Sequence, residues 1–309
     1  MRIIFFGSDD FAALHLESLL KSRHTVAGCV TQPDTRQGRG MKVVLSPIKI
    51  LAAEHSIDYI QPDTLKDPSV MAWLKERQAD VFVVVAYGRL LTQDILNTPK
   101  LFAVNVHGSM LPRYRGAAPI NWAILNGDAR SGVTVQKMAL ALDAGDIIAQ
   151  ERIDIGPEEG ADVLRAHMAK AGAKLLVKTL DGIEQGKYKL TPQDPGQVSH
   201  APKLTKHMGK INWSDAAQVI HDQVRGLKPW PGTHTLYKGK MLKILNASVS
   251  VQAQRAKPGV VTAVDKQSFS VACGSGLLII REVQPEAGKA MPARSFIAGH
   301  KIAIGARLE

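Results

Sequence analysis

Short apolar runs alternate with helical patterns over the first 90 residues of the chain. Residues 2–6 form a mainly apolar run that Gly7 interrupts, and residues 11–20 then place leucines at helical spacing. A second apolar run at 26–31 completes the pattern of a β-α-β unit. Residues 79–87 are almost continuously apolar, which is typical of a strand buried on both faces of a sheet.

The same alternation continues to about residue 186. Residues 101–107 and 132–138 are further strand candidates, and apolar residues recur with a helical period over 161–183. Strands that alternate with helices favour a largely parallel sheet covered on both faces. We therefore predict a Rossmann-like α/β domain over residues 1–186, with a polar loop over residues 32–42.

The pattern changes after residue 186. Residues 187–212 contain three prolines and little periodicity, and we interpret them as a linker. One short helix is predicted over 214–226, and the rest of the chain has short strand patterns separated by glycine-containing turns. Residues 213–309 therefore predict a small β-barrel of the OB-like kind.

Composition narrows the class of protein. Two cysteines among 309 residues are too few for a disulfide scaffold or a cysteine-based zinc site. No apolar run approaches the roughly 18 residues that a membrane span needs. We therefore expect a soluble, cytoplasmic protein that has no membrane partner.

The charge is distributed unevenly along the chain. The formal net charge is +11, of which residues 1–200 carry +1 and residues 201–309 carry +10. Such an asymmetry favours a chemical role for the first domain and a polyanionic partner for the second. A basic surface that serves only solubility is the alternative.

Several familiar catalytic motifs are missing from the sequence. Gly7 stands alone after the first strand, so the glycine-rich turn of dinucleotide-binding proteins is absent. The phosphate-binding loop, the H-E-x-x-H zinc motif and the G-x-S-x-G nucleophile motif are absent too. We therefore expect neither a nicotinamide cofactor nor a metal.

A polar pair stands at the end of one predicted strand. Asn105 and His107 are two residues apart, so they lie on the same face of the strand. Ligands of open α/β sheets bind at the carboxyl ends of strands. There an amide N–H can stabilise a developing oxyanion, and an imidazole can transfer a proton near neutral pH. A buried, hydrogen-bonded pair that merely closes the strand is the alternative.

Asp143 is a loop carboxylate between the strand candidates over residues 132–138 and 147–153. A carboxylate beside His107 would orient the imidazole ring. Aspartate is also common in turns for backbone reasons alone, so a structural role stays open at this point.

Two stretches of sequence resemble a known family. They are Asn105-x-His107 followed by residues 109–120, which read SMLPRYRGAAPI, and residues 142–146, which read LDAGD. Both are similar to the formyltransferases that use 10-formyltetrahydrofolate as formyl donor. The resemblance implies Asn105, His107 and Asp143 as catalytic residues. It also implies a folate-binding segment made of Ser109, Met110, Leu111 and Pro112.

Three further stretches resemble the branch of that family that acts on methionyl-tRNA. They are the loop over residues 31–40, the linker over 201–213 and residues 229–233, which read PWPGT. This resemblance implies formyl transfer to initiator methionyl-tRNA, with Arg36, Arg39, Lys42 and Lys206 among the tRNA-binding residues. Transfer RNA is a polyanion, which agrees with the basic last third. His207, Met208 and Asn212 depart from the family's usual linker.

Two other functions remain open from the sequence. One is a sugar-nucleotide or other small-amine formyltransferase, in which the basic domain would meet diphosphates. The other is a non-catalytic RNA-binding protein on the same scaffold, against which the presence of Asn105, His107 and Asp143 together argues. We expect the protein to act as a monomer.

Overall fold

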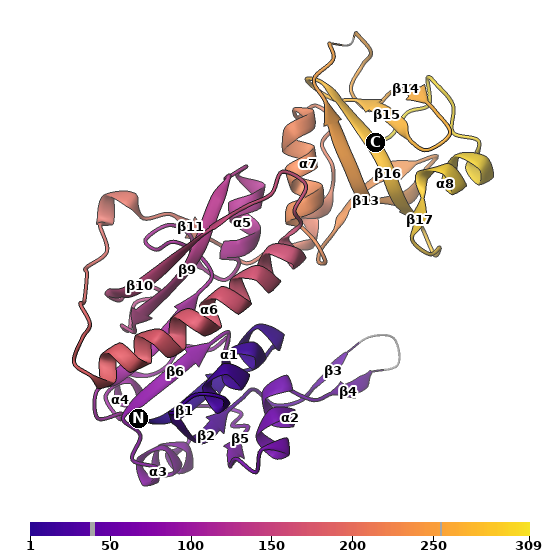
Figure 1. Cartoon of the computed structure of the whole chain (residues 1–309). Coiled ribbons are helices and arrows are strands. Elements are labelled where there is room, and N and C mark those ends of the chain that lie inside the picture. The colour runs from indigo at the N-terminus through magenta and orange to yellow at the C-terminus, as the bar shows by residue number, and fades with distance from the viewer. Residues whose placement is uncertain (38–40, 254) are drawn as a thin grey trace. The chain divides into compact units, whose positions relative to one another are not determined.

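The computed structural model describes residues 1–37, 41–253 and 255–309. The described chain divides into two compact units, each of which we describe by itself (Figure 1). The first unit comprises Met1–Pro119, Ser131–Asp154 and Arg165–Ala201. The second comprises Ile120–Arg130, Ile155–Leu164 and Pro202–Glu309. None of the described helices is long and apolar enough to cross a membrane.

A seven-stranded sheet organises the first unit, in the order β10-β9-β7-β6-β1-β2-β5. Its strands are β1 (Arg2–Gly7), β2 (Thr25–Val30), β5 (Tyr59–Ile60), β6 (Val81–Val85), β7 (Phe102–His107), β9 (Arg130–Lys137) and β10 (Ile147–Asp154). The pairs from β7 through β6, β1 and β2 to β5 are all parallel, whereas β9 runs antiparallel to β7. The predicted Rossmann-like, largely parallel sheet is confirmed.

Burial explains why β1 and β6 read as continuous apolar runs. Every residue of β6 is buried, and so are all residues of β1 after Arg2. Ile4, Phe6, Phe82 and Val84 belong to one apolar cluster that also includes residues of the helices α3 and α4. Burying one such side chain contributes about 1.5–3 kcal/mol, so this cluster is a main source of the unit's stability.

Helices lie between these strands, as the alternating pattern predicts, and α6 follows the last of them. They are α1 (Asp10–Leu20), α2 (Pro47–Glu54), α3 (Pro68–Glu76), α4 (Gln93–Leu96), α5 (Pro119–Leu125) and α6 (Ala161–Glu184). Asp9 caps α1 by accepting a hydrogen bond from the Ala12 N–H, and Ser46 caps α2 by accepting from Ile48. Each cap satisfies a backbone donor that the helix itself leaves unpaired.

The loop predicted over residues 32–42 contains a short hairpin instead. Strands β3 (Thr35–Gln37) and β4 (Lys42–Val44) pair antiparallel, with Arg36 opposite Val43 and Gln37 opposite Lys42. Three-residue strands in a polar segment leave too little apolar alternation to be detected from sequence. Arg39 lies outside the described residues.

An antiparallel sheet organises the second unit, in the order β12-β13-β16-β15-β14, with β17 beside β16. Its elements are α7 (Ala217–Gly226), β12 (Thr233–Tyr237), β13 (Lys240–Ser250), β14 (Val261–Val264), β15 (Phe269–Ala272), β16 (Leu277–Pro285), β17 (Met291–Pro292) and α8 (Ala293–His300). Leu308 bridges to Tyr237, and Arg307 bridges to Val260. The last residues thus connect the β12 edge to the chain just before β14 and close the sheet into the predicted barrel.

The segment between residues 187 and 212 carries three short elements. They are the 3-10 helix η1 (Pro195–Gln197), the strand β11 (His200–Ala201) and the 3-10 helix η2 (Lys206–Gly209). Strand β11 pairs in parallel with β8 (Arg115–Gly116), so its backbone lies against the segment that follows β7.

Candidate active site

A buried polar face forms where β7 and β9 lie side by side. Asn105 is paired with Gln136 across the two strands, and His107 is paired with Thr134. The valines that alternate with them, at 104, 106, 133 and 135, point to the opposite face of the sheet and are buried. Buried polar groups need hydrogen-bond partners. Gln136 bonds to Asn105 and to Asp143, which in turn lies beside His107, whereas Thr134 bonds to the segment after β7.

Asn105 is held at both ends of its amide group. Its Nδ2 donates to the Val84 carbonyl at 3.0 Å, and its Oδ1 accepts from Gln136 Nε2 at 3.2 Å. Within the described part of the chain, the second hydrogen on Nδ2 has no recorded partner. One amide donor is therefore available beside the end of β7.

His107 is fixed by the chain that follows β7. Its Nε2 lies 2.8 Å from the Tyr114 carbonyl, which can only accept, so Nε2 carries a proton. Its Nδ1 lies 3.6 Å from Asp143 Oδ1, and the side chains are 7% and 11% exposed. The imidazole ring therefore stands between a backbone carbonyl and a carboxylate.

Asp143 sits in a tightly constrained turn. Its backbone φ is +50°, in the left-handed region, and its Oδ2 accepts from the Gly116 N–H at 2.9 Å. A Cβ at Gly145 would lie 1.7 Å from the Lys137 carbonyl oxygen, so only glycine fits there. Gln193 Nε2 donates to the backbone carbonyls of Asp143 and Gly145, at 2.8 and 2.7 Å. The position of the carboxylate is thus set by the geometry of the turn and by Gln193, which is 50 residues away in sequence and bonds to the turn's backbone.

The segment from Ser109 to Pro112 is anchored mainly through backbone bonds. Thr134 Oγ1 donates to the Ser109 carbonyl at 2.7 Å and accepts from the Leu111 N–H at 3.1 Å. Gln150 Nε2 donates to the Leu111 carbonyl at 2.9 Å, and the Leu111–Pro112 peptide bond is cis. The side chain of Met110 is half-buried, so this segment presents a fixed edge next to the polar face.

The structure therefore brings the three predicted catalytic residues together. It also adds two residues that sequence reasoning missed, Gln136 and Gln193. Gln136 could have been found, because Val133-Thr134-Val135-Gln136 repeats the apolar–polar alternation of Val104-Asn105-Val106-His107. Gln193 has no such signal, because it lies in a segment without periodicity.

The predicted tRNA-binding residues lie elsewhere. Arg36 is in β3 and Lys42 is in β4, and only their backbone is described. Arg39 is outside the described residues. Lys206 opens η2 in the second unit, and its side chain is exposed.

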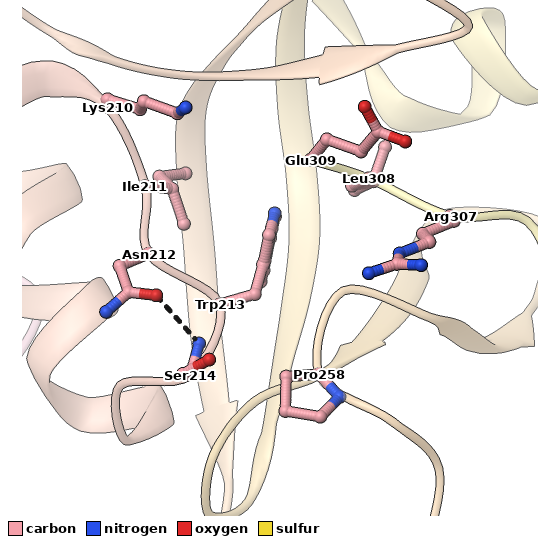
Figure 2. Close-up of a pocket in the computed structure, with 9 residues that line it drawn as sticks. All are labelled: Lys210, Ile211, Asn212, Trp213, Ser214, Pro258, Arg307, Leu308 and Glu309. Atoms are coloured by element: carbon pink, nitrogen blue, oxygen red, sulfur yellow. Dashed lines mark hydrogen bonds between the residues drawn. The ribbon is translucent and has the colours of Figure 1, made fainter.

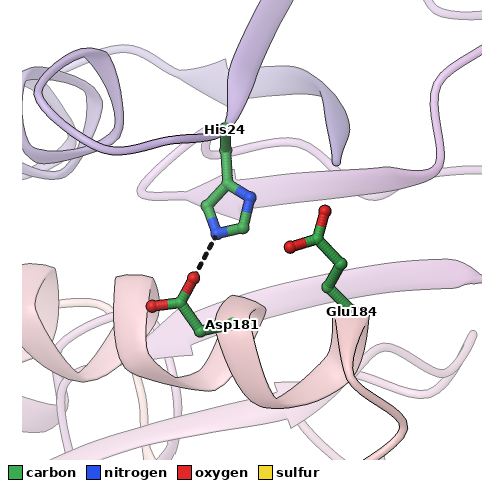
Figure 3. A group of neighbouring side chains, drawn as sticks. All are labelled: His24, Asp181 and Glu184. Carbon is green, nitrogen blue, oxygen red and sulfur yellow. Dashed lines mark ion pairs between the residues drawn. The ribbon is translucent and has the colours of Figure 1, made fainter.

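A second cluster of titratable groups, His24, Asp181 and Glu184, has the composition of a metal site (Figure 3). His24 Nε2 lies 3.3 Å from Asp181 Oδ1. However, the Arg23 guanidinium lies 2.7 Å from Asp181 and 2.8 Å from Glu184. Burial is the main cause of a pKa of His24 below its usual value. The Met1 ammonium lies 2.7 Å from Glu184 as well, so two cations balance the two carboxylates and the cluster is an ion-pair network.

The second unit contains a hollow of about 450 Å³ beside Trp213 (Figure 2). Lys210 and Arg307 line it, as do Asn212 and Ser214, where Asn212 Oδ1 accepts from the Ser214 N–H at 3.2 Å. Trp213 is 5% exposed and donates from Nε1 to Thr235 Oγ1 at 3.0 Å, so its ring belongs to the barrel core. The lining of the hollow is mixed: Ile211, Pro258 and Leu308 are apolar, and Glu309 lies there with the two cationic side chains.

Comparison with known proteins assigns both parts of the chain to the formyl transferase family. Residues 1–180 match the family model described as formyl transferase, and residues 203–301 match the formyl transferase C-terminal domain. A methionyl-tRNA formyltransferase of Geobacter metallireducens is 42% identical over 308 residues, which is 100% of this chain and 98% of that protein. One from Caldanaerobacter subterraneus is 42% identical over 310 residues and 100% of both chains.

A solved structure with a similar fold is more distant in sequence. An N-formyltransferase from Helicobacter canadensis, in complex with folinic acid and dTDP-3-aminofucose, aligns with a TM-score of 0.66. It is 19% identical and covers 92% of this chain and 99% of that one. At this level of identity the likeness concerns the fold alone.

Proposed function

Because the chain belongs to the formyl transferase family, and matches methionyl-tRNA formyltransferases over its full length, we propose that it formylates initiator methionyl-tRNA. The formyl donor is 10-formyltetrahydrofolate, and the acceptor is the free α-amine of the esterified methionine. The product, N-formylmethionyl-tRNA, serves translation initiation. The observation that carries this proposal is that Asn105, His107 and Asp143 are linked through the Gln136 amide and the His107–Asp143 contact.

The reaction forms one carbon–nitrogen bond and breaks another. The amine attacks the formyl carbon, the carbonyl oxygen gains negative charge, and the bond to the folate N10 then breaks. The amine loses a proton, and N10 gains one. The site therefore needs a donor for the oxygen and a group that moves a proton.

Asn105 is the donor for the oxygen, because one of its amide hydrogens has no protein acceptor in the described structure. His107 assists it and transfers the proton. Its Nε2–H is donated to the Tyr114 carbonyl. The ring therefore contacts substrate either by sharing this hydrogen between the carbonyl and the substrate or by rotating away from the carbonyl. Asp143 orients His107 through Nδ1 and helps to deprotonate the attacking amine.

Ser109, Met110, Leu111 and Pro112 are proposed to lie along the folate. The backbone bonds from Thr134 and Gln150 fix this segment, and a fixed edge suits a rigid, planar donor. Its position directly after β7 supports a donor whose formyl group lies near Asn105 and His107.

The tRNA is proposed to bind to the basic barrel and the β3–β4 hairpin. Residues 201–309 carry +10 of the net charge, and phosphate neutralisation supplies salt-sensitive affinity. Lys206 and the hollow lined by Lys210 and Arg307 offer cations within the second unit. Arg36, Arg39 and Lys42 are proposed to contact the acceptor arm. In this division, residues 1–186 hold the chemistry, 187–212 link the two parts, and 213–309 bind tRNA.

Substrate profiling tests the proposal. The purified protein is incubated with 10-formyltetrahydrofolate and either methionyl initiator tRNA or amino-sugar nucleotides. We expect formylated methionyl-tRNA and unchanged sugar nucleotides. Formylation of the sugars alone would overturn the proposal in favour of the sugar-nucleotide alternative. We expect the enzyme to act in the cytoplasm as a monomer. Size-exclusion chromatography of the active fraction checks the oligomeric state.

A further inference from the structure

Gln136 touches two of the proposed catalytic residues with one nitrogen atom. Its Nε2 donates to Asn105 Oδ1 at 3.2 Å and to Asp143 Oδ1 at 3.3 Å. Its own Oε1 lies 3.5 Å from Gln193 Nε2. Gln136 is only 2% exposed, so these bonds form away from solvent, where a lost partner is costly.

For Asn105, this contact decides which end of the amide faces the substrate. A carboxamide has an oxygen end that only accepts and a nitrogen end that only donates. The Gln136 donor sits at Oδ1 and the Val84 carbonyl sits at Nδ2, so both neighbours favour the same orientation. The second N–H of the amide is thereby kept on the nitrogen end, beside the Val84 carbonyl. Turning the amide over would place donor against donor and acceptor against acceptor.

For Asp143, the contact completes the support of the carboxylate. Oδ2 is held by the Gly116 N–H, while Oδ1 faces both Gln136 Nε2 and His107 Nδ1. With one donor on each oxygen, the plane of the carboxylate is fixed relative to the His107 ring. A fixed geometry matters because a misplacement of about 1 Å can cost roughly 100-fold in rate.

We infer that Gln136 is a positioning residue, whose amide nitrogen sets Asn105 and Asp143 in register for formyl transfer. The inference rests on the proposed function. It predicts that the donor nitrogen, and not the shape of the side chain, is what the reaction requires. Gln193 holds the backbone of the Asp143 turn, and its Nε2 lies close to Gln136 Oε1.

Two substitutions of similar length separate the donor from the shape. Gln136→Met keeps the volume and removes both polar atoms. Gln136→Glu keeps the oxygen and replaces the donor with a second acceptor. We expect kcat for methionyl-tRNA formylation to fall by about 10- to 100-fold in Q136M, and further in Q136E, with KM for the folate donor changed less than about twofold.

The pH dependence of Q136E is the sharper readout. A protonated glutamic acid has an O–H donor, so the ratio of Q136E to wild-type kcat rises as the pH falls. A residue that only fills space would show no such recovery, and Glu would be tolerated better than Met because its shape is closer to Gln.

A control and a double-mutant cycle complete the experiment. Val135→Ala, on the opposite face of β9, lowers the melting temperature while kcat per folded molecule stays near that of the wild type. In an N105A background, Q136M lowers kcat by a smaller factor than in the wild type, because one of the two residues that Gln136 positions is gone.

The outcomes separate this inference from the proposed function. No methionyl-tRNA formylation by the wild type would overturn the proposed function. Normal wild-type turnover, together with wild-type kcat in Q136M or fully additive effects in the cycle, would overturn only the role of Gln136. If Q136M does not fold, the pH response of Q136E still tests the role of Gln136. A ratio of Q136E to wild-type kcat that does not rise at low pH would overturn it.

Discussion

Asn105 and His107 contribute to the site in different ways, although they are neighbours on one strand face. Asn105 has a free donor and fixed neighbours, whereas both ring nitrogens of His107 already face protein groups. Asn105→Ala or His107→Ala should lower kcat by about 10²–10⁴-fold, because both act mainly on the transition state. Folate affinity should change little. Steady-state kinetics and folate titration on folded variants check this, and wild-type turnover in either variant would contradict the assignment.

Asp143 combines a backbone role with a charge. Asp143→Asn keeps the shape and the acceptor for the Gly116 N–H, but removes the ionised oxygen facing His107. We expect a large loss of kcat and a small change in melting temperature. If the variant instead unfolds while activity per folded molecule stays normal, Asp143 is a structural turn residue.

His15 is a residue whose protonation should affect stability rather than catalysis. It is fully buried, its Nδ1 donates to the Phe11 carbonyl, and its Nε2 packs against Gly172, where a Cβ would lie 2.8 Å away. Burial is the main cause of a pKa lowered to about 4, from 6.5 in an unfolded chain. Because the unfolded state binds the proton more readily, the stability due to neutral His15 is present above pH 6.5 and is lost as the pH falls towards 4.

The size of this effect follows from the shift in the pKa of His15. It corresponds to about 3 kcal/mol of unfolding free energy between pH 7 and pH 4. Denaturant unfolding of wild type and His15→Met at pH 7, 5.5 and 4 measures it. The stability difference between the two proteins should change by about that amount. A difference that stays constant with pH would show that His15 takes up its proton normally in the folded protein.

At the scale of elements, the β3–β4 hairpin carries the tRNA prediction that can be tested most directly. A guanidinium offers a planar pair of donors that suits phosphate, which an ammonium cannot reproduce. Arg39→Ala should reduce kcat/KM for methionyl-tRNA by about 10- to 100-fold, and Arg39→Lys should recover only part of it. The dependence of tRNA affinity on salt should also flatten by about 0.7–0.9 log units per log unit of salt.

Lys66→Ala is the control for Arg39, because it removes one exposed cation from a different loop of the first unit. It should leave formylation unchanged. An Arg39→Ala enzyme with normal kcat/KM and an unchanged salt dependence would show that this position is a solvated turn.

The elements also show what the sequence could predict. Strands β1, β6 and β7 were predictable because their apolar runs are bounded by polar residues and glycine. The antiparallel direction of β9 was not, because the hydrophobic pattern of a strand is the same in either direction. The pairing of β11 with β8 was not either, because two-residue strands have no periodicity and their partners are about 85 residues apart.

The residues of the candidate site also fall into those that the sequence could predict and those that it could not. Asn105, His107 and Asp143 could be proposed because their residue types suit the chemistry and their motifs resemble a family. Gln193 could not, because its role depends on three-dimensional closeness to the Asp143 turn, which residue spacing does not encode.

At the scale of the whole molecule, the two compact units do not follow a single cut in the chain. Residues 155–164 belong to the second unit, where the buried Arg225 donates to the carbonyls of Gly156 and Glu159. Residues 187–201 belong to the first, through Gln193 and β11. A truncation that removes the basic domain should therefore end after Ala201 rather than near Gly186.

A fragment of residues 1–201 should keep the donor site and lose most tRNA affinity. It retains Gln193, β11 and the Ser199 Oγ that accepts from the Tyr114 N–H, but only about a tenth of the net charge. It should melt at a lower temperature, because the carbonyls of Gly156 and Glu159 lose their Arg225 donors.

A fragment of residues 1–186 is the matched control, and it should bind a folate analogue more weakly because the Asp143 turn loses Gln193. Calorimetry with the analogue and filter binding with tRNA measure both affinities. Tight tRNA binding by residues 1–201 would show that the basic last third is not the main tRNA-binding surface.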